Sequence, residues 1–239
     1  MDSIKAHIRN YLEYCKSQKC LDAKTLKAYR IDLRQFSEQI SNINITEITS
    51  EILEQYVSQL HEQYKPKTVK RKIASVKALF HYLDYKEIIN TNPFSKILIH
   101  FREPVKLPKT IPLHTVEIFL YAIYKQRKNA KTPYQKRNAL RDIAVAELLF
   151  STGMRISELC SLKVNDVNLY DGTILIYGKG SKERRIQIGN ESVIKILTEY
   201  NDNFCSERQS CSNFFVSQSG KALSDQSIRR MINKYTSLA

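Results

Sequence analysis

The densest group of residues with chemical potential is the run Ser151-Thr-Gly-Met-Arg-Ile-Ser-Glu-Leu159. Arg155 follows a glycine turn and opens a helix directly after an apolar helical stretch, so its guanidinium is expected to be held rigidly. A guanidinium held in this way can bind two phosphate oxygens as a fork. Glu158 lies three residues on, near Arg155 on the helix surface. It could orient this arginine or a partner group, or the two could form a purely structural ion pair.

A second candidate group surrounds two glycines, Gly178 and Gly180. A lysine between two glycines lets the backbone approach a phosphate closely, while its ammonium acts as a cation or a proton donor. The alternative is an exposed basic turn, and the sequence contains neither a Walker motif nor a dinucleotide fingerprint. The cations of this group are Lys179, Lys182, Arg184 and Arg185.

The charge of the chain points to a polyanionic partner. Its 239 residues hold 38 Lys and Arg against 24 Asp and Glu, a formal net charge of +14. Residues 1–104 carry 17 cations and 12 acids, and residues 105–239 carry 21 and 12, so both halves are basic. Nucleic acid is the commonest such partner, and two basic halves suit a protein that grips duplex DNA from two sides.

Two clusters of cations without any acid stand out, at residues 65–72 and 125–141. The first holds five cations in eight residues, and its apolar positions keep helical spacing, so the cations are expected to project from the other helix faces. Either cluster could instead be an ordinary solvated face. The candidate DNA contacts in these clusters are Lys65, Lys67, Lys70, Arg71, Lys72, Lys136, Arg137 and Arg141. At the glycine turn they are Lys182 and Arg184.

Other features exclude several classes of protein. The five cysteines show no CxxC spacing, which argues against a disulfide framework or a zinc site. The longest strongly apolar stretch, residues 143–150, contains a glutamate and is too short to cross a bilayer. No apolar segment of a signal peptide follows Met1. We therefore expect a cytoplasmic protein with no membrane partner.

These side chains need a scaffold, and the hydrophobic pattern predicts a mainly helical one. Residues 1–85 contain four stretches with apolar residues at helical spacing, which favours a compact four-helix bundle. Residues 86–110 contain three prolines and no clear periodicity, as in an extended linker. The predicted domains are therefore 1–86 and 111–239, joined by a linker at 87–110.

The second domain is predicted to combine helices with a small β-hairpin. Helices are expected over about 115–126 and 134–150, with Gly153 as a left-handed cap, and again from Ile156. After residue 166 the spacing of apolar residues changes from a period of 3.6, typical of a helix, to a period of 2, typical of a strand. Residues 173–178 and 184–189 are therefore expected to form a hairpin. A helix is expected at 191–200, a loop at 201–212, a short strand near 214–216 and a last helix after the cap Ser224-Asp225.

At these motifs the chain resembles the tyrosine recombinases of the Xer and phage-integrase type. Residues 152–159 match the family's box around its first catalytic arginine, and residues 178–184 match its β-hairpin box with the catalytic lysine. Arg155 and Lys179 are 24 residues apart, as the family pattern leads one to expect. Residues 25–33 and 67–80 resemble helices of the family's core-binding domain. The resemblance implies a four-helix, SAM-like core-binding domain followed by an α+β catalytic domain.

The resemblance also implies a function. A recombinase of this type closes as a C-shaped clamp on duplex DNA, then cuts and rejoins it through a 3′-phosphotyrosyl intermediate, without a metal or other cofactor. Arg155 would bind the scissile phosphate together with a second arginine, and Lys179 would protonate the departing 5′ oxygen. Glu158 would support Arg155. Further copies of the chain or of a paralogue would join on DNA, as a tetramer in the complete protein.

The sequence departs from the family pattern in one respect. It contains no His-x-x-Arg run, and Tyr235 continues an apolar stripe and is expected in the core, so no nucleophile is expected among these residues. We therefore expect a catalytic domain that is incomplete at its C-terminus. The alternative is a catalytically inactive DNA-binding protein that occupies recombination sites. A basic helical adaptor unrelated to DNA is a third reading, if both boxes are coincidental.

Overall fold

The computed structural model describes residues 3–40, 43–98, 107, 109–178 and 182–239. The chain divides into two compact units, Met1–Leu107 and Pro108–Ala239, each with a hydrophobic core of its own. None of the described helices is long and apolar enough to cross a membrane.

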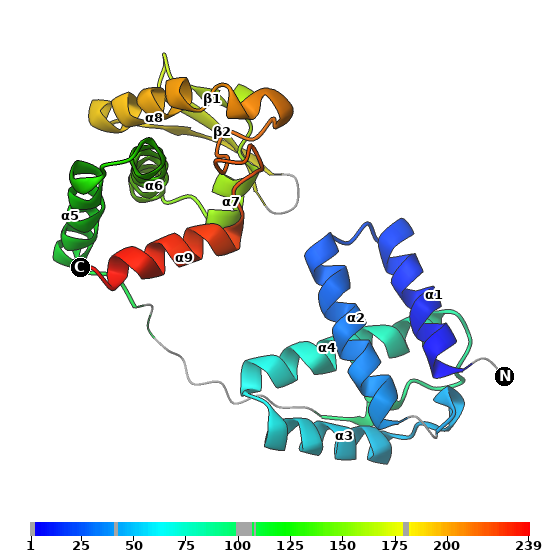
Figure 1. Cartoon of the computed structure of the whole chain (residues 1–239). Helices are drawn as coiled ribbons and strands as arrows, with labels where there is room; N and C mark the ends of the chain where they lie inside the picture. Colours follow the sequence, from blue (N-terminus) through cyan, green and yellow to red (C-terminus); the bar gives the residue numbers. More distant parts are fainter. Residues whose placement is uncertain (1–2, 41–42, 99–106, 108, 179–181) are drawn as a thin grey trace. The chain divides into compact units, whose positions relative to one another are not determined.

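The first unit is the predicted four-helix bundle (Figure 1). Local sequence signals set where these helices begin. The Ser3 side chain accepts a hydrogen bond from Ala6 N–H, Asp22 accepts from the backbone of Lys24 and Thr25, and Pro66 occupies the first turn of its helix. The helices are α1 (Ile4–Ser17), α2 (Ala23–Gln39), α3 (Ser50–Gln63) and α4 (Pro66–Tyr85), with short 3-10 helices η1 (Ile45–Glu47) and η2 (Pro93–Lys96).

The core of the first unit lies between these helices, and the inner face predicted for α4 is buried. Part of the stretch expected as a linker also belongs to this core, which corrects that expectation. Ile89 and Phe94 are buried, and the Phe94 ring meets Phe80 edge-on with 5.6 Å between centroids. Burial of such a ring contributes about 2 kcal/mol. Ile89, Pro93 and Phe94 therefore help to hold this stretch on the bundle, although its sequence shows no helical period.

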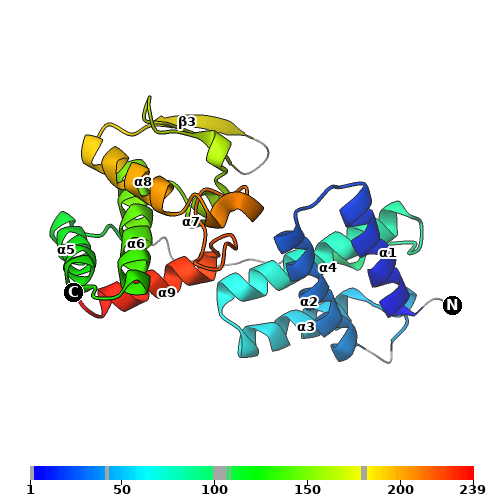
Figure 2. The same ribbon diagram turned by 45° about the horizontal axis from the view of Figure 1, so that its top comes forward.

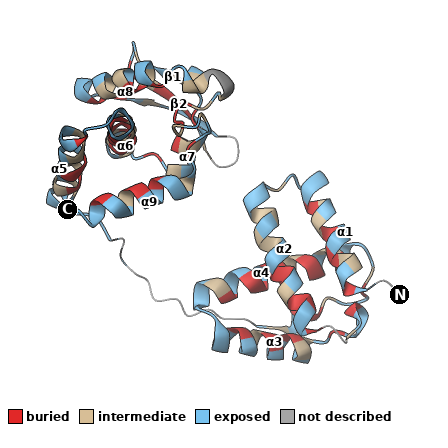
Figure 3. Cartoon of the chain, viewed as in Figure 1, coloured by how far each residue is buried: buried red, intermediate tan, exposed pale blue. Residues whose placement is uncertain are grey.

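The second unit is built around one central helix, α6 (Figures 1 and 2). Every residue from Ala139 to Leu149 is buried or half-buried. Figure 3 colours the elements of both units by burial. The helices α5 and α8 pack against α6. The helices of this unit are α5 (Leu113–Asn129), α6 (Pro133–Thr152), α7 (Ile156–Ser161), α8 (Glu191–Asn203) and α9 (Asp225–Thr236), with 3-10 helices η3 (Val164–Asp166) and η4 (Glu207–Ser210).

A three-stranded antiparallel sheet in the order β1-β2-β3 completes this unit. The predicted hairpin is confirmed in β2 (Thr173–Tyr177) and β3 (Glu183–Gln187), where Ile176 pairs with Arg184. The third strand, β1 (Val167–Asn168), was not predicted, because two residues leave no readable period.

Two smaller expectations for this unit were wrong. Helix α8 extends to Asn203 and η4 follows it, so the stretch 201–212 is not simply a loop. Residues 214–216 form no strand; that region makes only the isolated bridges Lys163↔Asn213 and Val216↔Ala222. Burial of Phe214, Phe215 and Val216 explains their apolar character without a strand.

Candidate functional site

The Glu158 carboxylate organises the start of α7. Helix α6 ends at Gly153, whose φ of +62° is the predicted left-handed cap, and Arg155 then begins the next helix. Glu158 Oε2 accepts the Arg155 backbone N–H at 2.8 Å, and Oε1 accepts Arg155 Nη1 at 2.9 Å. One buried carboxylate therefore holds both the backbone and the guanidinium of Arg155.

Arg184 on β3 binds the same carboxylate as a fork. Its Nη1 donates to Glu158 Oε1 at 3.0 Å, and its Nη2 donates to Oε2 at 2.8 Å. The hydrogen bonds from Arg184, followed by those from Arg155, lower the pKa of Glu158 to about 2. The carboxylate is therefore ionised at neutral pH, and it ties the β-hairpin to α7.

The guanidinium groups of Arg155 and Arg184 differ in exposure and in how many N–H groups remain available to a ligand. The Arg155 side chain is 72% exposed, whereas that of Glu158 is 5% exposed. Because the carboxylate binds one of its terminal nitrogens, the other N–H groups of Arg155 can receive a phosphate. The Arg184 side chain is 41% exposed and commits both terminal nitrogens to Glu158. Arg184, expected as a DNA contact, thus holds the site together.

The base of the hairpin tip lies against this cluster. The Gly178 N–H donates to the Lys182 carbonyl oxygen at 2.7 Å. A Cβ on Gly178 would stand 3.2 Å from that oxygen, 3.6 Å from Arg184 Nη1 and 3.9 Å from Glu158 Oε1. Glycine therefore lets the hairpin pass close to the carboxylate. Lys179, the candidate proton donor, lies outside the described residues, whereas Lys182 is exposed.

The cations of the cluster at residues 65–72 differ in burial. Lys65, Lys67 and Lys70 are exposed, as expected. Lys72, however, is only 2% exposed, so the expectation that it projects toward DNA is corrected. The reason lies on α2, whose apolar stripe carries the fully buried Asp32.

Asp32 collects three partners from α4. Lys72 Nζ lies 3.7 Å from its Oδ1, Ser75 Oγ donates to its Oδ2 at 2.9 Å, and Arg71 pairs with the same oxygen. Lys72 also donates to Gln35. Burial lowers the pKa of Lys72, although Asp32 acts in the opposite direction. These contacts join α2 to α4. An acid within the helical apolar stripe of residues 25–40 was the sequence signal that could have indicated them.

In the cluster at residues 125–141, the three candidate DNA contacts differ in exposure and in their ion-pair partners. Lys136 is exposed. Arg137 pairs with Glu207, donates to the Asn203 carbonyl at 2.8 Å and lies over the Phe204 ring. The Arg141 side chain is 17% exposed and pairs with Asp142 at 2.7 Å. Two of the three expected contacts are therefore engaged inside their own unit.

Tyr235 on α9 is a core residue, which confirms the prediction for it. It is buried, and its hydroxyl donates to Asp142 Oδ2 at 3.1 Å. Burial and the neighbouring Asp142 raise its pKa well above the ordinary value.

Over the described ranges, no three His, Cys, Asp or Glu side chains gather where they could hold a metal ion.

Comparison with known proteins gives the same fold and names the family. The profile of the Phage integrase family matches residues 122–239, and that of the Phage integrase N-terminal SAM-like domain matches residues 8–87. A tyrosine recombinase of Agathobacter rectalis is 66% identical over 239 residues, which cover 100% of this chain and 78% of that protein. The chain belongs to the tyrosine recombinase family. This family acts in site-specific DNA recombination.

More distant members of the tyrosine recombinase family match nearly the full length of this chain. The chain is 28% identical to tyrosine recombinase XerC of Thermodesulfovibrio yellowstonii over 241 residues, 98% of this chain and 76% of that one. Its fold matches that of the Tn1549 transposon integrase in complex with transposon right end DNA (TM-score 0.71, 20% identity, 100% of this chain and 80% of that one). It also matches a lambda integrase tetramer bound to a Holliday junction (TM-score 0.70, 16% identity, 99% and 66%).

Proposed function

We propose that this chain binds duplex DNA and acts in recombination through a 3′-phosphotyrosyl intermediate. Arg155 binds the scissile phosphate, Lys179 protonates the leaving oxygen and Glu158 positions Arg155. The observation that carries this proposal is the exposed Arg155 guanidinium, held from behind by a buried, ionised carboxylate. A cation fixed in this way is already oriented when charge develops on the phosphate.

The proposed chemistry needs no external energy source. A tyrosine oxygen forms a bond to phosphorus while the bond from phosphorus to the 5′ oxygen breaks, and Lys179 gives its proton to that oxygen. Arg155 stabilises the negative charge on the non-bridging oxygens during transfer. Reversal of the same steps rejoins the strand, because the phosphotyrosyl bond conserves the energy of the broken bond.

We further propose that these 239 residues alone bind DNA without forming the covalent adduct. They contain no His-x-x-Arg run, and Tyr235 is buried against Asp142. The competing function is a catalytically inactive DNA-binding protein that occupies recombination sites. Both functions share the DNA interface and differ in whether a nucleophile ever reaches the phosphate.

We assign the DNA interface to six of the exposed cations. They are Lys65, Lys67, Lys70, Lys136 and Lys182, besides Arg155. We assign residues 1–86 to DNA binding and residues 111–239 to catalysis. Within 87–110, Ile89 and Phe94 pack with the first unit, so we assign to the connection the part that follows Phe94. Because two solved structures of this fold hold DNA, one of them as a tetramer, we propose duplex DNA and further copies of the chain or of a paralogue as partners in the cytoplasm.

The proposal is tested with a labelled duplex of about 30 base pairs, by fluorescence anisotropy over a range of salt concentrations. Each phosphate contact contributes about 0.9 to the slope of log K against log salt. We expect Arg155→Ala to reduce that slope by about 1 and to weaken binding. Lys195→Ala, an exposed cation on α8, serves as the matched control and leaves the slope unchanged. Equal slopes in the three proteins would contradict the role of Arg155.

A nicked duplex that traps covalent intermediates tests the chemistry separately. We expect no adduct on a denaturing gel from these 239 residues. An adduct would show that one of their own tyrosines attacks the phosphate, and would overturn that part of the proposal. Absence of any DNA binding at low salt would overturn the DNA function itself.

A further inference from the structure

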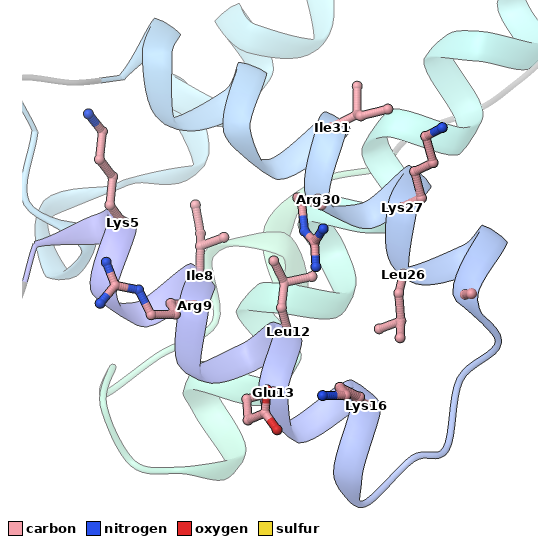
Figure 4. Close-up of a pocket in the computed structure, with 11 residues that line it drawn as sticks. Lys5, Ile8, Arg9, Leu12, Glu13, Lys16, Leu26, Lys27, Arg30 and Ile31 are labelled. Carbon is pink, nitrogen blue, oxygen red and sulfur yellow. The ribbon is translucent and has the colours of Figure 1, made fainter.

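A groove of about 790 Å³ lies between α1 and α2 in the first unit, and none of the residues assigned to DNA or to catalysis lines it (Figure 4). Its floor is apolar. Ile8 and Leu12 come from α1, and Leu26 and Ile31 come from α2. Ile8 is buried, Leu12 and Leu26 are half-buried, and Ile31 is 39% exposed. The two helices thus present an aliphatic strip that the bundle core only partly covers.

The rim of this α1–α2 groove is strongly basic. One acid, Glu13, is set against five exposed cations. Within the described part of the chain, none of the five forms an ion pair, in contrast to the nearby Arg34, which pairs with Glu38. The cations are Lys5, Arg9 and Lys16 on α1, and Lys27 and Arg30 on α2.

We propose that the α1–α2 groove binds an acidic amphipathic helix of a partner protein. A helix with apolar residues at i, i+3, i+4 and i+7 fits a groove between two helices, and its apolar face covers the aliphatic strip. Acidic residues on its flanks meet the basic rim, so the charges are complementary on both sides. The 14 residues of α1 span about 21 Å, so a helix of similar length fills the groove.

Two other occupants fit less well. A DNA backbone would satisfy the cations but would leave the strip of Ile8, Leu12, Leu26 and Ile31 uncovered, because phosphates and sugars offer it little apolar surface. In a second copy of this chain, the acidic patch on α3 is a candidate to meet the basic rim, but its residues are all polar. That patch consists of Glu51, Glu54, Gln55, Ser58 and Gln59, and it offers no apolar side chain to the floor of the groove.

The test uses a fluorescein-labelled peptide of about 14 residues, the length of α1, with leucine on one helical face and glutamate elsewhere. Its binding to the whole chain is followed by anisotropy. A scrambled peptide of the same composition and a peptide with lysine in place of glutamate are the controls. We expect the amphipathic acidic peptide to bind at least about tenfold more tightly than either control, a difference of about 1.4 kcal/mol.

Variants locate the binding to the groove. Arg9→Glu and Arg30→Glu, which reverse charges at the rim, are expected to weaken the peptide about tenfold each. Ile31→Ser, which removes an exposed floor residue with little cost to the core, is expected to weaken it about fivefold. Lys77→Glu makes the same charge change at an exposed position of α4 outside the groove, and is expected to change affinity less than about twofold.

The outcomes are decisive in either direction. Equal binding of the acidic and scrambled peptides, or equal losses from Arg9→Glu and Lys77→Glu, would show nonspecific charge attraction and would overturn the proposal. Displacement of the peptide by duplex DNA that depends on Arg9 and Arg30 would assign the groove to DNA instead. Self-association that is lost in Arg9→Glu would assign it to a second copy. None of these results depends on the role of Arg155, so the DNA function is tested separately.

Discussion

At the residue scale, Glu158 determines the geometry of the candidate site. Its carboxylate receives two N–H groups from Arg155 and two from Arg184. Because four donors stabilise the charged form of this buried carboxylate, it stays ionised near neutral pH. The same contacts prevent the guanidinium of Arg155 from sampling many rotamers, which lowers the entropy lost when it binds a phosphate.

The first prediction concerns the charge of Glu158. Its pKa falls from the ordinary value of 4.5 to about 2 in the folded protein. A lowered folded-state pKa means stability that is present above about pH 4.5 and lost as the pH falls toward 2. We therefore expect Glu158→Gln to lower the free energy of unfolding by about 2 kcal/mol at pH 7, and by progressively less between pH 4.5 and 2.

Urea denaturation followed by circular dichroism at pH 7, 4.5 and 3 measures this difference. Glu183→Gln, an exposed carboxylate on the same strand as Arg184, is the matched control and should change stability by less than about 0.5 kcal/mol. If the loss in Glu158→Gln were the same at pH 3 as at pH 7, the carboxylate charge would not be what binds the hairpin to α7.

At the element scale, helix α4 serves two purposes with one basic run. Lys67 on α4 and Lys65 just before the helix are exposed to solvent, whereas Lys72 on another side of α4 lies against the buried Asp32 of α2. Apolar positions at helical spacing identified the inner face of α4 correctly. They did not reveal that a cation shares that face, because a lysine there is favourable only with an acid opposite it, on another helix.

The second prediction separates these two kinds of lysine. Lys72→Ala leaves Asp32 with fewer buried partners and is expected to lower the free energy of unfolding by about 3 kcal/mol. Lys67→Ala is expected to cost less than about 0.5 kcal/mol but to reduce the salt slope of DNA binding by about 0.9. Urea denaturation and anisotropy on both variants measure the two effects. A loss of salt slope without a loss of stability in Lys72→Ala would contradict its burial.

At the scale of the whole molecule, two hydrophobic cores stabilise two units. Leu33 lies in the core of the first and Leu197 in that of the second, and both are fully buried. A net charge of +14 is spread over both halves of the chain. The charge favours association with a polyanion, whereas the fold of each unit rests on its own buried apolar residues.

The third prediction follows from the separate cores. Leu33→Ala and Leu197→Ala are each expected to lower the free energy of unfolding of their own unit by about 3 kcal/mol. Hydrogen exchange measured by mass spectrometry should show faster exchange in peptides of α2 and α4 for the first variant, and in peptides of α6 and α8 for the second. Faster exchange throughout both units from one substitution would contradict independent cores.

The sequence by itself determined most of the helices, the caps at Gly153 and Ser224, the hairpin and the two boxes that carry Arg155 and Lys179. These features depend on residues within about one or two turns of each other, so periodicity, glycine and capping side chains report them. The burial of Tyr235 was also predictable, because it continues a local apolar stripe. The family resemblance rested on the same local runs.

Only the tertiary structure decided which charges meet. The fork from Arg184 to Glu158 spans 26 residues, and the pair of Arg71 with Asp32 spans 39. A lysine in a sequence is ordinarily expected to face solvent. Helical spacing places Lys72 beside Val69 and Val76 on the inner face of α4, but only Asp32 on another helix makes its burial favourable. Long-range partners compensate the desolvation of a buried charge, and those partners become known only when the helices and strands are brought together.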